Sequence, residues 1–280
     1  MQNKFVLSIL IVAFSLSGCA GNQTDPMAVA PTQTAFKSFS SVKPNKEYEI
    51  PAMVLTKDSW WDNGTNISTG PNVDLNAAIL TYFNSDGTLK SVSLKGSSSQ
   101  KSVQPTDNLG AGYQIANPKY YGYEYQTFGI WWENTYALDY SLFRQVSFST
   151  GHITEFNNIP TFGPRLFSGD YYGRSSSGGS FMGTIGFGVD FTNRSIDLVI
   201  SNAATHSPSR PPSSTNQYNM TGTLRWDDSN NFSGIVSGTT DTSLIGTAFG
   251  RFYGPSAEEL GGVIQARNST QDIMILFGAK

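Results

Sequence analysis

The residues that could carry chemistry are few in this sequence. Only two histidines are present, His152 in STGHITEF and His206 in ATHSPSRPPSS. A catalytic zinc site normally takes about three protein ligands, and neither HExxH nor CxxC occurs, so the sequence does not favour a metalloenzyme. A Ser-His-Asp triad stays open, but its GxSxG motif is absent. We therefore expect no enzyme activity, and the simplest interpretation of each histidine is a strand or loop residue without a special task.

Histidine and tyrosine side chains could instead bind a ligand. Either residue type can ligate haem iron, so His152 and His206 are candidate haem ligands. The segment YGYEYQTFGIWW (121–132), preceded by Tyr120, is dense in tyrosine. Tyrosine joins a large apolar face to a polar hydroxyl, which suits exposed interfaces as well as strand cores. The candidate residues for a binding face are Tyr120, Tyr121, Tyr123, Tyr125 and Trp61.

Trp61 belongs to a Trp60-Trp61 pair beside a turn signal, Asp62-Asn63-Gly64. Alternate strand residues face opposite ways, so we expect one of the two tryptophans to be buried and the other to form an exposed aromatic tip. Haem, if it binds, would be a cargo, and no cofactor is required.

Two adjacent glutamates, Glu258 and Glu259, lie in GRFYGPSAEELGG (250–262). On a helix they would point about 100° apart, which makes a catalytic pair unfavourable. Ser256 and Glu259 have the spacing of a capping box, Pro255 precedes them, and two glycines follow. This pattern predicts one capped helical turn between two strands.

The first residues indicate export. Lys4 precedes an apolar run from Phe5 to Phe14, and small residues follow, as in a secretory signal (1–18) that is too short to span a bilayer. Leu16-Ser17-Gly18-Cys19 resembles the lipobox of bacterial lipoproteins, which implies lipidation of Cys19 and a membrane anchor. The alternative is an ordinary cleaved signal with an incidental cysteine. Ala20 follows the cysteine without an aspartate, which resembles the outer-membrane sorting pattern.

Composition narrows the class further. Lys and Arg number 18 against 21 Asp and Glu, and no basic stripe occurs, so we expect no nucleic-acid partner. Aromatic residues make up 13% and glycines number 28, which is typical of all-β proteins. Residues 19–39 lack a period and contain two prolines, which predicts a flexible tether.

The second half of the chain, 161–280, predicts a barrel. Apolar residues alternate from Phe181 to Phe191 and again from Ile196 to Ile200, with Thr192-Asn193-Arg194 as the turn. About eight such strands follow in sequence, the number at which an antiparallel barrel closes around its own side chains. Polar residues such as Asp190 on the second face favour a soluble barrel over a transmembrane one.

The first half, 40–160, predicts a less regular sheet domain. Residues 77–94 read as a hairpin with its turn at Asp86-Gly87, and further strands are expected at 48–55, 127–133 and 145–154. The linker into the barrel is placed at NNIPTFGPR (157–165), where two prolines interrupt both periods.

Several segments carry a family resemblance. NIPTFGPRLFSGDYYG (158–173), VDFTNRSIDL (189–198), GTAFGRFYGPSAEELGGVIQ (246–265) and ILFGAK (275–280) resemble the barrel domain of transferrin-binding protein B. The resemblance covers 158–280 and implies a family of surface lipoproteins that also includes haemoglobin and haem binders such as haemophilin. The N-terminal half matches only in layout, as the variable handle that precedes each barrel. The chain has room for one handle-plus-barrel lobe, which favours single-lobe members over a transferrin receptor.

The resemblance implies a lipid-anchored protein of the outer-membrane surface that binds a host iron or haem carrier, or haem itself, for nutrient acquisition. An outer-membrane transporter and a surface-lipoprotein translocator are implied as further partners. Because handle loops clamp the ligand in haemophilin-like members, His152 is favoured over His206. The alternatives are a binder of a host complement regulator, an adhesin, or a periplasm-facing carrier of a small apolar ligand.

Overall fold

The computed structural model describes most of the chain after residue 35. The described residues are 36–44, 46–62, 65–68, 72–96, 100–102, 113–136, 141–176, 179–207, 210–214 and 216–280. The predicted signal peptide and residues 19–35 of the predicted tether lie outside them. Residues Gln33–Lys280 form one compact unit. None of the helices in the described residues is long and apolar enough to cross a membrane.

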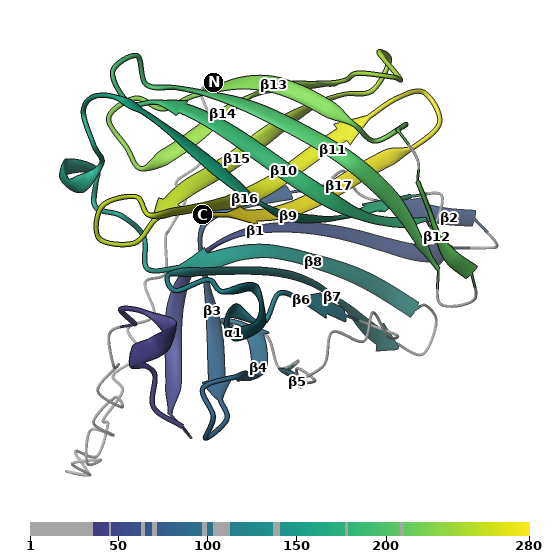
Figure 1. The fold of residues 1–280 in the computed structure, drawn as a ribbon. Helices are drawn as coiled ribbons and strands as arrows, with labels where there is room; N and C mark the ends of the chain where they lie inside the picture. The colour runs from purple at the N-terminus through teal and green to yellow at the C-terminus, as the bar shows by residue number, and fades with distance from the viewer. Residues whose placement is uncertain are drawn as a thin grey trace, which may run out of the picture. The chain divides into compact units, whose positions relative to one another are not determined.

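The N-terminal sheet is antiparallel and follows the order β5-β4-β3-β1-β8-β7-β6, with β2 paired to β1 (Figure 1). Its strands are β1 (Glu47–Asp62), β2 (Thr65–Ser68), β3 (Asn72–Phe83), β4 (Leu89–Leu94), β5 (Gln100–Ser102), β6 (Tyr113–Ile115), β7 (Gln126–Tyr136) and β8 (Ser141–Gly151). The predicted 77–94 hairpin is confirmed, because β3 pairs with β4 and Gly87 takes the positive φ of 81° that its turn requires. Three short helices accompany the strands: η1 (Phe39–Ser41), α1 (Pro118–Tyr121) and η2 (Phe156–Asn158).

Packing of this domain begins before the predicted boundary at residue 40. Phe36 and Phe39 are buried, and their rings contact Tyr48 and Phe83 edge-on. The prediction of a tether up to residue 39 is therefore wrong at its end, because these two phenylalanines fill the core of the sheet domain.

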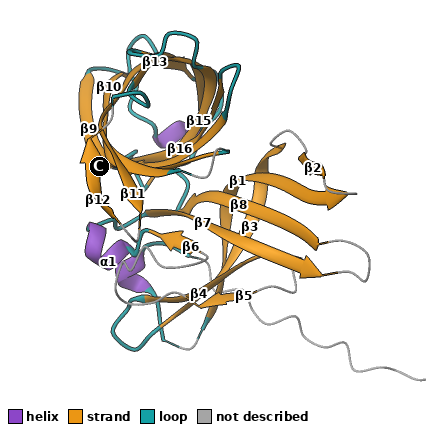
Figure 2. Ribbon diagram, turned by 90° about the vertical axis from the view of Figure 1, so that its right-hand side faces the viewer, coloured by secondary structure: helices purple, strands orange, loops and turns teal. Residues whose placement is uncertain are grey.

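The C-terminal sheet closes on itself. Its order is β10-β9-β17-β16-β15-β14-β13-β11, and β10 also pairs with β11, which completes an eight-stranded antiparallel barrel seen end-on in Figure 2. The strands are β9 (Pro164–Ser175), β10 (Ser180–Asp190), β11 (Ser195–Ser207), β13 (Met220–Arg225), β14 (Asn231–Gly238), β15 (Ile245–Tyr253), β16 (Glu259–Arg267) and β17 (Asp272–Ala279). The predicted all-β fold with a barrel is confirmed.

The apolar face of each barrel strand points inward, as the alternation predicts. Phe181, Ile185, Phe187 and Val189 of β10 belong to one buried cluster that fills the barrel, together with Leu260 of β16. Closure of the sheet into a barrel buries one face of every strand. It also leaves no unpaired strand edge in the ring.

A short strand follows β11 outside the closed ring. The Pro/Ser-rich stretch after β11 contains β12 (Arg210–Ser214), which pairs with the end of β11 outside the closed ring. His206 therefore has its backbone in β11 and not in a loop. Pro211 and Pro212 are compatible with this position, because β12 is an edge strand that does not need every N–H.

Candidate ligand-binding surface

The tyrosine segment lies where the N-terminal sheet domain meets the barrel. Asn117 caps the one-turn helix α1, and Gly122 ends it with a left-handed φ of 70°. Tyr120 stands on this turn with 58% of its surface exposed. A short helix with an early proline and a glycine stop thus presents one tyrosine to solvent just before β7 begins.

The barrel holds the residues that follow α1 from several sides. The Lys280 ammonium donates to the Gly122 carbonyl at 2.7 Å, and the Tyr123 hydroxyl donates to the Gly278 carbonyl at 2.6 Å. The Glu259 carboxylate accepts three backbone N–H groups: from Glu124 at 2.7 Å, Tyr125 at 3.0 Å and Gln126 at 2.9 Å. The position of the tyrosine segment is therefore fixed by the barrel.

The structure places Tyr123, a predicted binding residue, in the buried joint between the sheet domain and the barrel. Its side chain is only 4% exposed, and its ring is parallel to that of Tyr121 at 6.1 Å between centroids. Both rings meet Phe128 edge-on. Burial raises the pKa of the Tyr123 hydroxyl, so it stays a hydrogen-bond donor and cannot readily become a phenolate ligand.

The structure brings two of the predicted residues together. The rings of Tyr125 and His152 lie 6.5 Å apart between centroids, and the backbone N–H of His152 donates to the backbone carbonyl of Tyr125 at 2.8 Å. Both side chains are half-buried. Burial, and then the nearby charges of Glu258 and Glu124, raise the pKa of the Tyr125 hydroxyl. This corner can donate hydrogen bonds through a neutral phenol and has an imidazole ring beside it.

Two predicted candidates, Trp61 and His206, are placed by their backbone alone. The backbone of Trp61 pairs with Asn66 in the β1–β2 hairpin, and that of His206 lies in β11. Their side chains lie outside the described residues. Within the described ranges, no group of three or more His, Cys, Asp and Glu side chains is arranged to hold a metal ion.

The prediction of a capped helical turn at 255–261 is wrong. Residues 254–257 form a tight turn between β15 and β16, in which Gly254 and Ala257 take positive φ angles of 93° and 60°. The strand register pairs Tyr253 with Glu259, which leaves five residues for the connection. The Glu258 carboxylate, and not that of Glu259, accepts the Ser256 N–H at 2.8 Å. Tyr253 and Leu260 are buried, as expected.

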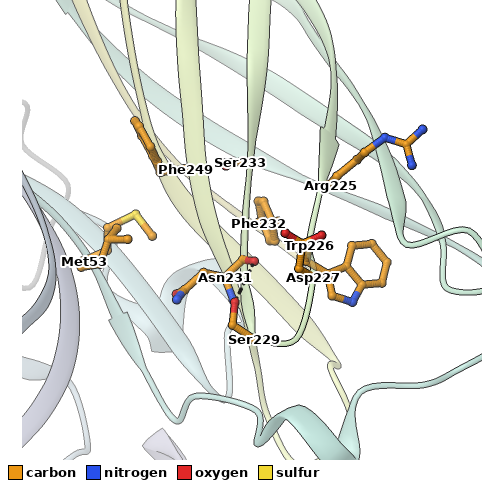
Figure 3. Close-up of a pocket in the computed structure, with 10 residues that line it drawn as sticks. Met53, Arg225, Trp226, Asp227, Ser229, Asn231, Phe232, Ser233 and Phe249 are labelled. Carbon is orange, nitrogen blue, oxygen red and sulfur yellow. Dashed lines mark hydrogen bonds between the residues drawn. The ribbon is translucent and has the colours of Figure 1, made fainter.

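A cavity between the sheet domain and the barrel was not predicted. It has a volume of about 230 Å³ and is lined from β1 and β3 by Met53 and Leu75, and from the barrel by the β13–β14 connection and Phe249 (Figure 3). Figure 3 shows Met53 facing the Ser229–Asn231 corner, while the Arg225 guanidinium points away from it. Pockets that enclose a drug-sized ligand measure roughly 300–1,000 Å³, so this cavity is too small to enclose a macrocycle such as haem.

A buried arginine lies beside this cavity and joins the two sheets. Arg251 is 4% exposed; its Nε donates to the Asn231 amide oxygen at 2.5 Å, and a second nitrogen donates to the Leu75 carbonyl. Burial lowers the pKa of the guanidinium, which nevertheless stays charged. No local pattern in the sequence indicates this contact, because Arg251 and Leu75 are 176 positions apart.

The fold and this site define a class: a β-barrel that carries a second sheet domain and presents a tyrosine-rich segment at their junction. Residues 149–280 match the family described as C-lobe and N-lobe beta barrels of Tf-binding protein B. This part of the chain is therefore similar to the transferrin-binding protein B barrel family, as the sequence resemblance predicts.

Several solved structures are similar. A transferrin-binding protein B variant from Haemophilus parasuis Hp5 is 18% identical over 77% of this chain and 47% of that chain, with a TM-score of 0.47. The isotype 1 transferrin-binding protein B from serogroup B Neisseria meningitidis is 19% identical over 76% of this chain and 44% of that chain, with a TM-score of 0.41. The N-lobe domain of lactoferrin binding protein B from Moraxella bovis is 12% identical over 83% of this chain and 98% of that chain, with a TM-score of 0.38. The chain spans about half the length of the two transferrin-binding proteins. No curated protein matches it.

Proposed function

We propose that the protein is a lipid-anchored binder of a host iron or haem carrier at the surface of the outer membrane. The observation that carries this proposal is the match of residues 149–280 to the barrels of Tf-binding protein B. The Leu16–Cys19 lipobox supports the anchor. The chain would take its cargo from a host protein, pass it to an outer-membrane transporter and reach the surface through a translocator.

The junction geometry supports a protein ligand. Tyr120 is exposed, and Tyr125 lies beside His152 on a segment that the barrel holds rigidly. Exposed tyrosines on a rigid support lose little conformational entropy on binding, which makes them effective contacts in protein interfaces. In this proposal Tyr120 and Tyr125 contact the carrier.

Haem itself is the second candidate, and a specific observation favours it. Tyr125 and His152 are both residue types that ligate haem iron, and their rings are 6.5 Å apart. The cavity at the sheet–barrel joint is too small for haem, so haem would lie on the open corner beside these two side chains.

The test is a binding screen with the full mature chain. Immobilised protein is exposed to human serum and to purified transferrin, lactoferrin and haemoglobin, and hemin is titrated in a spectrophotometer. Retention of one iron or haem protein that falls with Tyr120→Ala, but not with Ile235→Ala on the exposed barrel wall, supports the proposal. A Soret shift that His152→Ala removes supports haem. Retention of a complement regulator alone favours the alternative, and silence in every arm overturns the proposal.

The location is tested separately. Intact cells that express the protein are treated with a protease, with Cys19→Ala as the matched control. Surface exposure predicts digestion of the wild-type protein on intact cells. A lipid anchor on Cys19 predicts release of the control from the membrane fraction. Complete protection of the wild-type protein would place it on the periplasmic side and favour a carrier of small apolar ligands.

A further inference from the structure

The sheet domain covers part of the outer face of the barrel. β7 and β8 pack on β16 and β17, and we call this contact the joint (Figure 1). Along β17 the joint extends from Gly278 to Asp272, a span of six residues, which is roughly 20 Å of strand. We call its two extremes the Gly278 end and the Asp272 end.

The Gly278 end is held by many directional bonds between the sheet domain and the barrel. They are the bonds of Glu259 to the N–H groups of residues 124–126, of Tyr123 to Gly278, of Lys280 to Gly122, of Thr154 to Phe252 and Gly254, and of Ser149 to Tyr253. β8 also ends here, at Gly151, and the chain continues from this point into the barrel. The two layers are therefore fixed to each other at this end.

The polar contacts that cross the joint at the Asp272 end are weaker. The Lys57 ammonium lies 2.9 Å from the Asp272 carboxylate, and the Gln145 amide donates to the Met274 sulfur at 3.1 Å. The Asp272 side chain is 45% exposed, so water screens the ion pair, and a thioether sulfur is a weak acceptor. These contacts resist separation of the layers less than the bonds of the Gly278 end do.

Buried polar side chains without partners also lie in the joint. Ser147 lies on the face of β8 that meets the barrel, and its hydroxyl has no hydrogen-bond partner among the described residues. The same is true of the amide oxygen of Gln265, which shares the outer face of β16 with Val263 of the joint cluster. A third such side chain, Gln126, lies at the Gly278 end. Each of these groups would regain hydrogen bonds to water if its part of the joint opened.

The apolar part of the joint is rich in methionine. Met53 and Met274 belong to the cluster that joins the two layers, and Met182 packs against it. Met220, in contrast, lies in the core of the barrel. Methionine has a flexible, unbranched side chain that adapts when its neighbours move, so a joint packed by methionines tolerates movement better than a core of aromatic rings does.

We infer that the sheet domain is hinged on the barrel, so that the layers separate at the Asp272 end while the Gly278 end stays closed. Opening breaks the Lys57–Asp272 pair, hydrates Ser147 and Gln265, and brings Met274 into contact with solvent. The hydrogen bonds of the Gly278 end stay in place, so the tyrosine segment keeps its position on the barrel. The inference does not depend on the proposed function.

Methionine oxidation under native conditions tests the hinge. Hydrogen peroxide transfers one oxygen atom to a methionine sulfur that it can reach, and is itself reduced to water. Met274 and Met220 are only 4% and 0% exposed, so the closed structure shields both. Peptide mass spectrometry of the mature chain with Cys19→Ser should show Met274 oxidised at least about tenfold faster than Met220, because local opening takes less free energy than opening of the barrel core. Equal rates overturn the inference.

Variants separate opening from static exposure. Lys57→Gln removes the ion pair at the Asp272 end and should raise the oxidation rate of Met274. The matched control is Lys95→Gln, which removes the Lys95–Glu49 pair within the sheet domain and should leave that rate unchanged. Ser147→Ala removes a buried hydroxyl that has no partner among the described residues and should lower the rate, because the closed joint then contains one group fewer that prefers water.

The rate in Lys57→Gln decides the outcome. A rise at Met274 without a rise at Met220 supports the hinge. An unchanged rate at Met274 contradicts it, even where Met274 is oxidised faster than Met220 in the wild type, because static exposure then explains the difference. If Lys57→Gln does not fold, Asp272→Asn breaks the same pair with a side chain of nearly equal shape and is judged by the same two rates.

Discussion

Replacement of Glu259 should lower the stability of the protein, whereas replacement of its exposed neighbour Glu258 should not. It is 3% exposed and accepts N–H groups from Glu124, Tyr125 and Gln126. In Glu259→Gln the amide oxygen can replace the carboxylate oxygen that accepts two of these groups. The amide nitrogen then faces the third N–H, donor against donor. One buried donor without a partner costs about 1–3 kcal/mol, and we expect that loss of unfolding free energy.

Glu259→Ala removes the acceptors of all three N–H groups and should cost about 3 kcal/mol or more, since water can enter only partly at a buried joint. The assay is urea unfolding followed by tryptophan fluorescence near neutral pH. Glu258→Gln is the control, because Glu258 is exposed and accepts only the Ser256 N–H; it should stay within about 0.5 kcal/mol of the wild type.

Hydrogen exchange localises the effect. In Glu259→Gln the amides of Glu124, Tyr125 and Gln126 should exchange faster than in the wild type, and in Glu258→Gln they should not. An unchanged unfolding free energy together with unchanged exchange at these three amides would show that Glu259 does not hold the junction.

Three further predictions follow from buried groups. Burial raises the pKa of Glu259 from its ordinary 4.5 to about 7, so the folded state binds more protons; unfolding free energy should fall by about 3 kcal/mol as pH rises between these values, and Glu259→Gln should flatten that slope in urea titrations at several pH values. Leu260→Asp places a charge in the barrel core and should cost more than about 4 kcal/mol or prevent folding, as judged by circular dichroism, whereas Ile235→Asp at an exposed position should be tolerated. Tyr123→Phe removes one donor to the Gly278 carbonyl and should lower the unfolding free energy by about 0.5–1.5 kcal/mol; no change would mean that the hydroxyl is dispensable.

The barrel could be predicted from the sequence because its signal is local and repeated. The alternation from Phe181 to Val189 fixes which face is buried, and a strand that slipped by one residue would turn every one of these side chains outward. The turn at 192–194 and the Asp86-Gly87 hairpin were also predictable, because their residue types match the backbone that each turn requires.

The 254–258 turn could not be predicted by the same logic. Ser256 and Glu259 have a helical spacing, and local propensity favours a helix over Ala257 to Leu260. The pairing of β15 with β16 continues to Tyr253 and Glu259, however, and the hydrogen bonds of that ladder outweigh a preference spread over four residues. A short propensity signal between two strong strands is a weak predictor, since tertiary structure decides it.

The candidate site was predictable only in part. Tyrosine density selected the correct segment, but the sequence could not distinguish exposed Tyr120 from buried Tyr123 three residues later. That difference depends on the barrel: the Tyr123 hydroxyl reaches Gly278, a residue 155 positions away, and α1 turns Tyr120 outward. The cavity beside Met53 depends on contacts between strands distant in sequence, for which no local pattern exists.

Glu259 of the barrel motif then acquires a role in the proposed binding function without touching a ligand. Glu259 lies on the first residue of β16, inside the most regular part of the molecule, and its acceptor atoms hold the backbone from which Tyr125 projects. The handle segment is irregular and would sample many conformations alone, because a one-turn helix is not stable by itself. The hydrogen bonds from the barrel hold this segment in place, which reduces the conformational entropy lost on binding. The barrel therefore raises the affinity of the handle tyrosines for a carrier, although these tyrosines lie outside the barrel. On this reasoning, Glu259→Gln should weaken carrier binding through the position of Tyr125, even though residue 259 is buried away from any partner.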